Sequence, residues 1–547
     1  MNAPRPSGRP AHPGTAADAA PSTVPDTFDV LVVGGGINGA GIARDLAGRG
    51  VSVLLCEKDD LASHTSSSST KLIHGGLRYL EYYEFSLVRK ALAEREVLLK
   101  GAPHIMWPLR FVMPHDPSMR PAWMIRAGLF LYDHLAKREV LPGSRTIDLR
   151  THAAGKPLKR VFKTGFVYSD GWVNDARLVV LNAMDAAEHG ATVLTRWRVV
   201  DAERGAEHWR VQLQSSAGER RSVNARALVN AAGPWTAQFL SEHAHVPQAK
   251  SLRLVKGSHI VVKKLFDHDH AYIFQNPDKR IIFAIPYEDD FTLIGTTDVE
   301  HTGAVGEARI DESETAYLCE QASRYFEKAV APADVVWSYS GVRPLLDDES
   351  GDPSAVTRDY LLDLDTDAAQ APLLSVWGGK ITTFRKLAEE AADLLAGPLG
   401  ITRPAWTHGA SLPGGDLSAW IGKAAKPDTD FTRFVQALAL RHPELPPALC
   451  QRLARGYGAR VEQLLAGGLG AQVVPGVFEA ELDYLHDHEW ARTADDVLWR
   501  RTKLGLHLKP AQRQTVAVWC NARWGDPLAN AAASQDTTRT KPETSWN

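Results

Sequence analysis

The stretch FDVLVVGGGINGAGIARDLAGRGVSVLLCEK, residues 28–58, decides the fold of this chain. Residues 29–33 form an apolar, β-rich run, residues 34–39 match G-x-G-x-x-G, and residues 40–46 keep small and apolar side chains on one face of a helix. Residues 51–56 then supply a second strand. This order predicts a strand, a glycine turn, a helix and a parallel strand, which together form the first unit of a dinucleotide-binding domain.

The glycine turn also predicts where a dinucleotide lies. Its pyrophosphate has to approach backbone N–H groups at the start of a helix, where a Cβ would obstruct it. We therefore place Gly34, Gly36, Asn38 and Gly39 against the cofactor. Glu57 ends the second strand, where a carboxylate accepts hydrogen bonds from a ribose 2′-OH and repels a 2′-phosphate. This unit alone leaves open whether the dinucleotide is FAD or NAD.

Length and composition limit the remaining possibilities. A chain of 547 residues exceeds one compact core, so two or three domains are expected. The net charge of −3, from 62 basic and 65 acidic residues, gives no global preference for nucleic acid. The four cysteines lack C-x-x-C spacing, which favours a reduced cytoplasmic protein without a metal site. The sequence contains no run of 18 or more apolar residues, so no membrane-spanning helix is predicted. Residues 1–26 and 526–547 are predicted to be disordered tails.

Two further segments are predicted to contact the cofactor. In SHTSSSSTKLIHGGLRYLE, residues 63–81, a hydroxyl-rich loop leads to a Gly-Gly turn and then to Leu77, Arg78 and Tyr79, and the alternative is a flexible serine linker. In RALVNAAGPWT, residues 226–236, a buried strand ends in small residues and a Gly-Pro turn. Such a strand can pass close to a cofactor without a side-chain clash.

The segment 373–395 returns to the nucleotide-fold pattern. An apolar strand is followed by Gly378, Gly379 and Lys380, and the pair Thr382 and Thr383 suits the N-cap of the helix that begins at residue 384. A helix start directly after a glycine turn can stabilise negative charge on a reduced flavin ring. Lys380 is therefore well placed for chemistry.

Other segments are interpreted from their periodicity. Residues 85–100 are predicted to form an amphipathic helix whose Lys and Arg residues face solvent. WMIRAGLFLYDHL, residues 123–135, is either a buried core helix, which its residues alone favour, or a helix in a membrane interface. Residues 170–185 are expected to be helical and 191–200 to form a strand. Residues 417–524 suggest a small helical bundle in which Trp499, Arg500 and Arg501 serve as packing and surface residues.

The alternating segments between residues 252 and 298 predict an antiparallel sheet that covers the substrate. After it, Arg343 and Arg358 lie near the ends of predicted strands. Each arginine is either part of a surface salt bridge or a ligand for an anion.

Taken together, these motifs resemble one family. SSSSTKLIHGGLRYLE, RLVKGSHIVV, GTTD, YSGVRPL, TRDY and WGGKITTFRKLAE, with the glycine turn and Glu57, are similar to those of the aerobic, FAD-dependent glycerol-3-phosphate dehydrogenases, from residue 27 to beyond residue 506. The resemblance implies an α/β fold: a glutathione-reductase-type, Rossmann-like FAD domain at 27–404, an interleaved antiparallel-sheet cap mainly at 77–165 and 245–355, and a helical domain at 405–525. It implies oxidation of sn-glycerol 3-phosphate to dihydroxyacetone phosphate by hydride transfer from C2 to flavin N5.

The resemblance also implies partners and a location. Electrons would pass to membrane quinone, and the protein would be cytoplasmic and peripherally associated with the inner face of the cell membrane, as a homodimer without nucleic acid. This raises the interfacial interpretation of residues 123–135 to equal standing with the core interpretation. An oxygen-using oxidase or an amino-acid oxidase of the same fold, and a nucleotide-binding module without activity, are the alternatives.

The reaction asks for particular residue types. Arg78, Arg343, Arg358 and Lys380 could hold the phosphate and stabilise a developing alkoxide, with Tyr79 adding a hydroxyl contact. The predicted catalytic residues are His259, Lys380 and Arg343: His259 is the first choice for the base because of its ordinary pKa, Lys380 competes with it, and His74 better suits flavin contact. The predicted cofactor-binding residues are Gly34, Gly36, Asn38, Gly39, Glu57, Ser68, Ser69, Thr70, Leu72, His74, Gly75, Gly76, Gly233, Trp235, Gly379, Lys380, Thr382 and Thr383.

Overall fold

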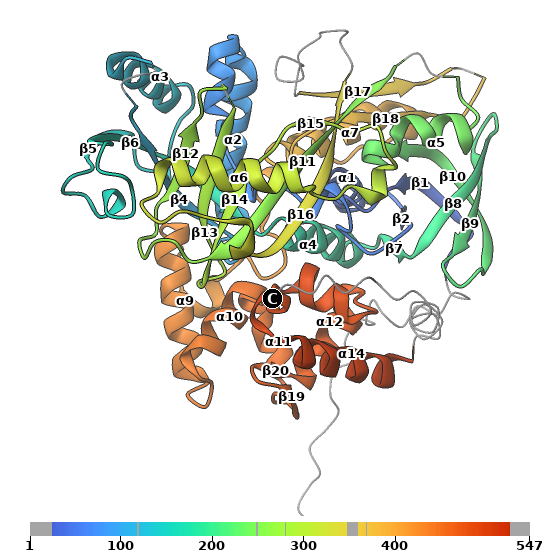
Figure 1. The fold of residues 1–547 in the computed structure, drawn as a ribbon. Coiled ribbons are helices and arrows are strands. Elements are labelled where there is room, and N and C mark those ends of the chain that lie inside the picture. The colour runs from blue at the N-terminus through green and yellow to red at the C-terminus, as the bar shows by residue number, and fades with distance from the viewer. Residues whose placement is uncertain are drawn as a thin grey trace, which may run out of the picture.

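A computed structural model of the chain describes residues 24–116, 120–247, 250–278, 280–346, 359–367 and 369–525. These residues form two sheets side by side, with a helical domain packed beneath them (Figure 1). The two predicted tails lie outside the described residues except for residues 24–26, and so does Arg358.

The first sheet is built around the glycine-turn unit. Strand β1 (Thr27–Val33) lies at its centre and pairs in parallel with β2 (Val53–Glu57) and β10 (Arg220–Asn230). Strand β7 (Thr192–Thr195) pairs in parallel with β2, and β18 (Leu373–Gly378) pairs in parallel with β10. Strand β17 (Tyr360–Asp365) pairs antiparallel with β18 at the edge of the sheet. Strands β8 (Trp197–Arg204) and β9 (Trp209–Ser215) form a hairpin, and β9 pairs with β10. Because the parallel strands are buried on both faces, their side chains are apolar in nearly continuous runs.

Helices cover both faces of this sheet. On one face, α1 (Ile37–Gly48), α4 (Asp175–Glu188) and α7 (Phe384–Leu399) pack against Val30 and Val32. On the other face, α5 (Thr236–Glu242) and the hairpin of β8 and β9 pack against Leu31 and Leu54. Alternate residues of β1 therefore enter two separate cores.

The second sheet forms the cap and is mainly antiparallel. In spatial order its main path is β15 (Val299–Glu300), β11 (Leu252–Lys263), β14 (Phe291–Gly295), β13 (Ile281–Tyr287), β12 (Ala271–Gln275), β4 (Met106–Pro114), β6 (Thr164–Val173) and β3 (Leu72–Ile73), while β16 (Val335–Leu346) pairs with β11 and β5 (Arg145–Asp148) with β6. Three helices lie beside this sheet: α2 (Phe85–Gly101), α3 (Ala122–His134) and α6 (Glu312–Tyr325) (Figure 1).

Two expectations about these elements are wrong, and one of the two interpretations of residues 123–135 is excluded. Residues 170–173 belong to β6, and the helix begins at Asp175, whose neighbour Asn174 caps it by accepting a hydrogen bond from the Arg177 amide. Arg95 of α2 does not face solvent, since it is buried and donates to Asp170 at 2.6 Å. Helix α3 is not a core helix, because Trp123 is 70% exposed and Phe130 is 59% exposed.

The helical domain contains α8 (Ser418–Ile421), α9 (Pro427–Arg441), α10 (Pro447–Tyr457), α11 (Val461–Leu465), α12 (Glu479–Glu489), α13 (Leu504–His507), α14 (Pro510–Trp524) and a short hairpin of β19 (Gln472–Val474) and β20 (Val477–Phe478). Buried ion pairs attach it to the first sheet: Arg177 of α4 pairs with Glu489, and Asp60 pairs with Arg500 and Arg501. Arg501 is buried and Arg500 is partly buried, so of the packing and surface roles predicted for residues 499–501, packing applies to Arg501. Among the described residues, no helix has the length and apolar character needed to cross a membrane.

Candidate functional site

A cavity of about 520 Å³ is walled by residues of both sheets. Its wall includes the start of α1, the end of β2, the loop before β3, and the turns after β10, β14 and β18. Segments from residue 33 to residue 382 therefore meet around one space, at the end of β1 where the sequence predicts the dinucleotide.

The predicted glycines shape the first end of this cavity. Gly34 and Gly36 line it and precede α1, while Gly39 does not line it but packs so closely that a Cβ there would overlap the Gly34 carbonyl. Gly34 has a φ of +106°, which side-chain-bearing residues rarely adopt. The cavity therefore opens onto the N–H groups at the start of α1, which favour an anion such as a pyrophosphate.

Glu57 is fixed by backbone hydrogen bonds. One carboxylate oxygen accepts from the Gly35 amide at 2.6 Å and the other from the Asp59 amide at 2.8 Å. Burial raises the pKa of the Glu57 carboxyl above its ordinary value. The carboxyl group lines the cavity at the end of β2, as predicted for a ribose ligand.

Near Glu57, aromatic and cationic residues line the same wall. Lys58 Nζ lies 3.7 Å from the centre of the Trp235 ring, and the ring of His64 lies 4.7 Å from it. Trp235 was predicted as a cofactor residue, whereas Lys58, His64 and Val199 were not. Val199 comes from β8, and nothing in its local sequence distinguishes it from other strand residues.

The serine-rich loop is held in place from behind. Ser68, Ser69, Thr70 and Leu72 line the cavity, as predicted. The buried Lys71 pairs with Asp175 at 2.8 Å, and Ser69 Oγ donates to the same carboxylate at 2.8 Å. Ser66, which the sequence did not single out, accepts a hydrogen bond from the Ile37 amide at 2.9 Å and so joins the loop to the start of α1. A loop fixed in this way is a wall of the site and not a flexible linker.

At the other end of the cavity, two cations lie on the wall. Arg343 of β16 donates to Asp298, and to Thr296 Oγ1 at 2.9 Å. Lys380 Nζ lies 3.9 Å from the centre of the Tyr79 ring. An aromatic face attracts a cation, so this contact holds the Lys380 ammonium at the wall.

The turn after β18 brings His74 to this end. The His74 amide donates to Thr382 Oγ1 at 3.2 Å, and His74, Gly379, Lys380 and Thr382 all line the cavity. Thr383 occupies the N-cap position of α7, but its side chain makes no capping hydrogen bond, which corrects that part of the prediction. Gly233 lines the wall near Trp235. Gly75 and Gly76 do not line it, and instead pack against Tyr132 and the Tyr79 ring.

His259 and Arg78 do not lie where a substrate contact requires. His259 is 1% exposed and absent from the cavity wall, and its Nε2 is hydrogen-bonded at 3.0 Å to the hydroxyl of Thr70, which does line the wall. Burial, with Arg343 and Lys71 nearby, holds the pKa of His259 well below its usual range. Arg78 also lies outside the wall and donates to the Tyr82 hydroxyl at 3.4 Å.

The residues present fit FAD. The helix start at α1 favours a phosphate, and Asn38 Oδ1, which is buried without a hydrogen-bond partner among the described residues, could accept a hydrogen bond from a donor group of the cofactor. The glycines leave space where a Cβ would intrude, and Glu57 marks the ribose position. The cavity continues from this nucleotide end to Lys380 and Arg343, and so leaves room for a reacting ring and an anionic substrate.

Comparisons with known proteins agree with this geometry. A family model described as FAD dependent oxidoreductase matches residues 29–383, and one described as the C-terminal domain of alpha-glycerophosphate oxidase matches residues 405–520. Over 493 residues the chain is 54% identical to a glycerol-3-phosphate dehydrogenase of Pseudomonas aeruginosa, covering 89% of this chain and 94% of that protein. It is 52% identical over 501 residues to a D-erythritol 1-phosphate dehydrogenase of Brucella abortus, covering 90% and 98%.

A solved structure gives the same result. The glycerol-3-phosphate dehydrogenase from Bacillus halodurans, complexed with FAD, superposes with a TM-score of 0.74 at 26% identity and covers 95% of this chain and 97% of its own. These matches confirm the predicted fold class and FAD as the cofactor.

Proposed function

This chain belongs to the FAD-dependent glycerol-3-phosphate dehydrogenases, and from that premise we propose that its cavity oxidises sn-glycerol 3-phosphate at C2 to dihydroxyacetone phosphate. The observation that carries the proposal is the placement of Arg343 and Lys380 on the wall of the cavity that fits FAD. Two cations beside a flavin site suit an alcohol that carries a phosphate group.

Arg343 and Lys380 hold the phosphate. A guanidinium presents several N–H groups to the phosphate oxygens, and the ammonium of Lys380 adds a second positive charge. The Tyr79 ring keeps Lys380 at the wall, and Tyr79 itself lines the cavity. Arg358, predicted for the same role, lies outside the described residues.

His74 is our assignment for the base that accepts the proton of the C2 hydroxyl group. It lines the cavity at the same end as Tyr79 and Lys380, and histidine accepts protons near neutral pH. Lys380 is assigned to the phosphate instead, because its Nζ lies 3.9 Å from the centre of the Tyr79 ring, an arrangement that suits an ammonium group. His259, the first choice from sequence, is assigned a positioning role, since it reaches the wall through the hydroxyl of Thr70.

FAD would be held by the start of α1, by Glu57 and by the serine-rich loop. When bound, the flavin supplies the hydride acceptor N5 and passes the electrons on, in our proposal to membrane quinone and not to oxygen. The residues of the chain bind the phosphate, orient C2 and accept the hydroxyl proton.

An anaerobic mixing experiment tests the function. Purified holoenzyme is mixed with sn-glycerol 3-phosphate, D-erythritol 1-phosphate or glycine, and the absorption bands of oxidised flavin are followed. We expect bleaching with sn-glycerol 3-phosphate. One relative is named for D-erythritol 1-phosphate, and faster bleaching with that compound would make it the preferred substrate of the same site. Bleaching with glycine alone would contradict the phosphate assignment.

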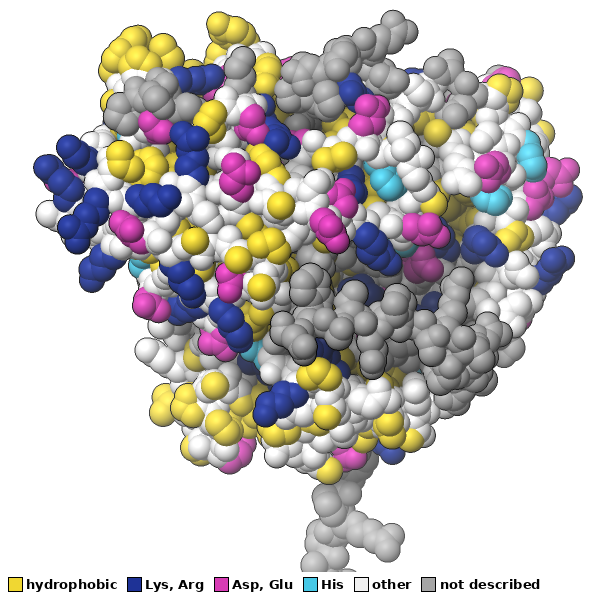
Figure 2. Space-filling model, in the orientation of Figure 1, with side chains coloured by type: hydrophobic (Ala, Val, Ile, Leu, Met, Phe, Trp, Pro, Cys, Tyr) yellow, Lys and Arg dark blue, Asp and Glu magenta, His cyan; other side chains and the backbone are white. Residues whose placement is uncertain are grey.

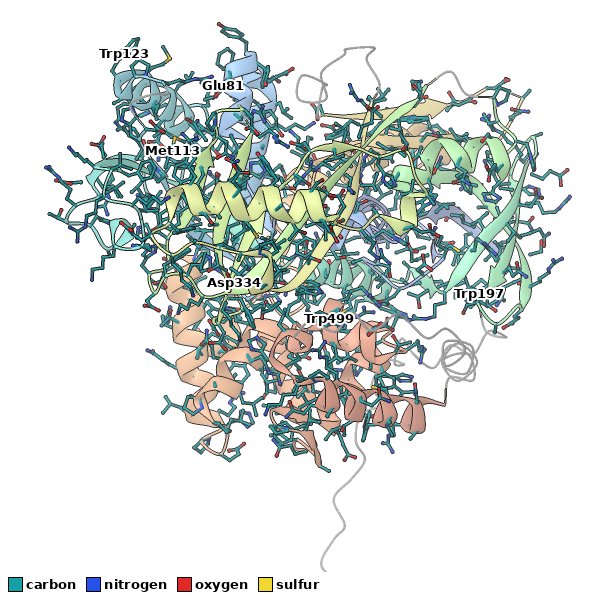
Figure 3. The ribbon with its side chains drawn as sticks, viewed as in Figure 1. Glu81, Met113, Trp123, Trp197, Asp334 and Trp499 are labelled. Carbon is teal, nitrogen blue, oxygen red and sulfur yellow. The ribbon has the colours of Figure 1, made fainter. Side chains whose placement is uncertain are left out.

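Membrane association is the second part of the proposal. The outer surface of α3 and the turn before α2 expose apolar side chains that project from one corner of the molecule (Figures 2 and 3). These residues, here named the apolar corner, are Tyr82, Tyr83, Phe85, Trp123, Met124, Phe130 and Leu131. Arg120 and Lys137 flank α3 in the sequence, and each also pairs with a carboxylate, that of Glu81 and that of Glu139. Apolar groups next to basic groups suit an anionic lipid surface. The homodimer stays a prediction.

A further inference from the structure

The Arg343 side chain occupies a space left by a glycine on the neighbouring strand. Gly257 of β11 lies in the strand that pairs with β16, and a Cβ at this glycine would overlap the Arg343 guanidinium and approach Thr296 Oγ1 to 2.9 Å. Lack of a side chain at residue 257 therefore lets Arg343 extend across β11 to the loop after β14. The position of the guanidinium depends on that loop.

Two groups of this loop determine how the guanidinium is turned. Nη1 donates to Asp298 Oδ1, and Nη2 donates to Thr296 Oγ1 at 2.9 Å. The Thr296 hydroxyl donates to the Thr297 carbonyl at 3.1 Å, so its hydrogen is committed and its oxygen is left to accept from Arg343. An arginine has five N–H donors in a planar fork, and fixing one on each terminal nitrogen sets the direction of the rest.

Asp298 is an unexpected neighbour for an anion site. Its side chain is 25% exposed, it lines the cavity, and it carries the same sign of charge as a phosphate. By Coulomb's law alone, it would weaken phosphate binding. A partly exposed ion pair of this kind also contributes little to folding stability. Its value to the site must therefore lie in the geometry it imposes on Arg343.

We propose that Asp298, together with Thr296, is a positioning residue that fixes the edge of the Arg343 guanidinium facing the substrate phosphate. This inference rests on the proposed function and names how that site recognises its anion. Without Asp298, the guanidinium turns toward solvent or toward other acceptors. Binding of the phosphate is then weaker, because the Arg343 side chain loses conformational entropy when it is ordered.

The test measures binding of inorganic phosphate to the oxidised holoenzyme through the change it causes in flavin absorption, together with KM and kcat for sn-glycerol 3-phosphate. In Asp298→Ala and Asp298→Asn we expect the dissociation constant for phosphate and the KM to rise about tenfold, with a smaller change in kcat and unchanged flavin content. Thr296→Val, which keeps the carboxylate, should raise both by about threefold.

Two controls separate orientation from charge. Glu300→Gln removes a carboxylate two residues away that pairs with Arg253 at 3.7 Å outside the cavity wall, and it should leave phosphate binding unchanged. In an Arg343→Lys background, Asp298→Ala should have little further effect, because an ammonium has no fork to orient.

Equal or tighter phosphate binding in both Asp298 variants would overturn the inference, since charge alone predicts that result. An additive effect in the Arg343→Lys background would overturn it as well. If the unaltered enzyme neither binds phosphate nor is reduced by sn-glycerol 3-phosphate, the proposed function fails together with this inference. If it does both, and the Asp298 variants behave like the unaltered enzyme, only the positioning role fails.

Discussion

The burial of one imidazole decides which histidine can exchange a proton with a substrate. The pKa of His259 lies well below its usual range because the ring is buried next to Arg343 and Lys71, so His259 is neutral at any pH near 7. Its Nε2 is engaged by Thr70 and its ring stacks on Tyr339 at 4.8 Å between centres. In our proposal, His259 therefore orients Thr70 and does not accept the proton of the substrate.

The first prediction concerns the base. The rate of flavin reduction by sn-glycerol 3-phosphate should rise with pH as the base loses its proton. Stopped-flow measurements between pH 5.5 and 9 should show that this rise is lost in His74→Asn and kept in His259→Gln and Lys380→Met. Loss of the rise in His259→Gln alone would restore His259 as the base.

The second prediction concerns the phosphate ligand. Arg343→Ala should raise KM for sn-glycerol 3-phosphate by about 10- to 100-fold, because charge-assisted hydrogen bonds to the phosphate are lost. Flavin content should not change. Arg78→Ala is the matched control: it also removes a guanidinium predicted for the clamp, but one outside the cavity wall, so its effect should be smaller. Equal effects of the two substitutions would place Arg78 in the clamp.

At this scale, sequence predicted best where a motif fixes the backbone. Gly34, Asn38 and Glu57 line the cavity because the strand–turn–helix motif fixes the position of the backbone at these residues. Asp298 was part of a recognised motif but received no role, since its partner Arg343 lies 45 residues away. The burial of His259 depends on β11, β14 and β16 packing together, and local sequence does not contain that information.

Helix α3 shows why a single element can be misjudged. A core helix and an interfacial helix share the same apolar composition, so residues 123–135 alone could not separate them. The structure buries only Leu129, Tyr132 and Asp133 of this helix. Arg95 of α2 is the opposite case, a charged residue drawn into the interior because Asp170 of β6 lies opposite it.

The third prediction belongs to this helix. Trp123→Ser with Phe130→Ser should reduce binding to vesicles of phosphatidylcholine and phosphatidylglycerol by at least about tenfold, since two large apolar side chains are lost from the apolar corner. Flotation of the holoenzyme with the vesicles measures this. Leu440→Ser is the matched control, because Leu440 is 84% exposed on α9. Equal losses from the two faces would contradict a specific docking surface.

Across the whole molecule, the helical domain is joined to the FAD domain by buried charges. Arg177 and Glu489 are both buried, and Arg177 also donates to the Gly456 carbonyl at 2.8 Å. Trp499, labelled in Figure 3, stacks on Trp337 of β16 with ring centres 4.9 Å apart, so the helical domain also contacts the cap sheet. The sequence predicted the domain types, but these contacts join residues more than 150 positions apart and carry no local signal.

The fourth prediction uses His104, which is buried at this junction. Burial, with Arg177 and Arg455 nearby, lowers the pKa of His104 to about 3, and neither ring nitrogen has a hydrogen-bond partner among the described residues. Below pH 6.5 the unfolded chain binds a proton at His104, whereas His104 stays unprotonated in the folded chain until the pH approaches 3. Folding stability therefore falls as pH drops from about 6.5 toward 3, by up to about 1.4 kcal/mol per pH unit from this residue.

Thermal unfolding of the holoenzyme between pH 7.5 and 5 tests this. His104→Leu, which has no proton to bind, should lose less Tm over this range than the unaltered protein. Parallel curves for the two proteins would show that His104 is protonated to the same extent in the folded and unfolded chains.

The order of the strands in the first sheet has a consequence for biosynthesis. Strand β1 leaves the ribosome first, yet its neighbour β10 follows about 190 residues later, and the turn that carries Lys380 later still. A growing chain that ends before β18 lacks one wall of the FAD site. The complete FAD site can therefore form only after β18 and the turn that follows it have been synthesised.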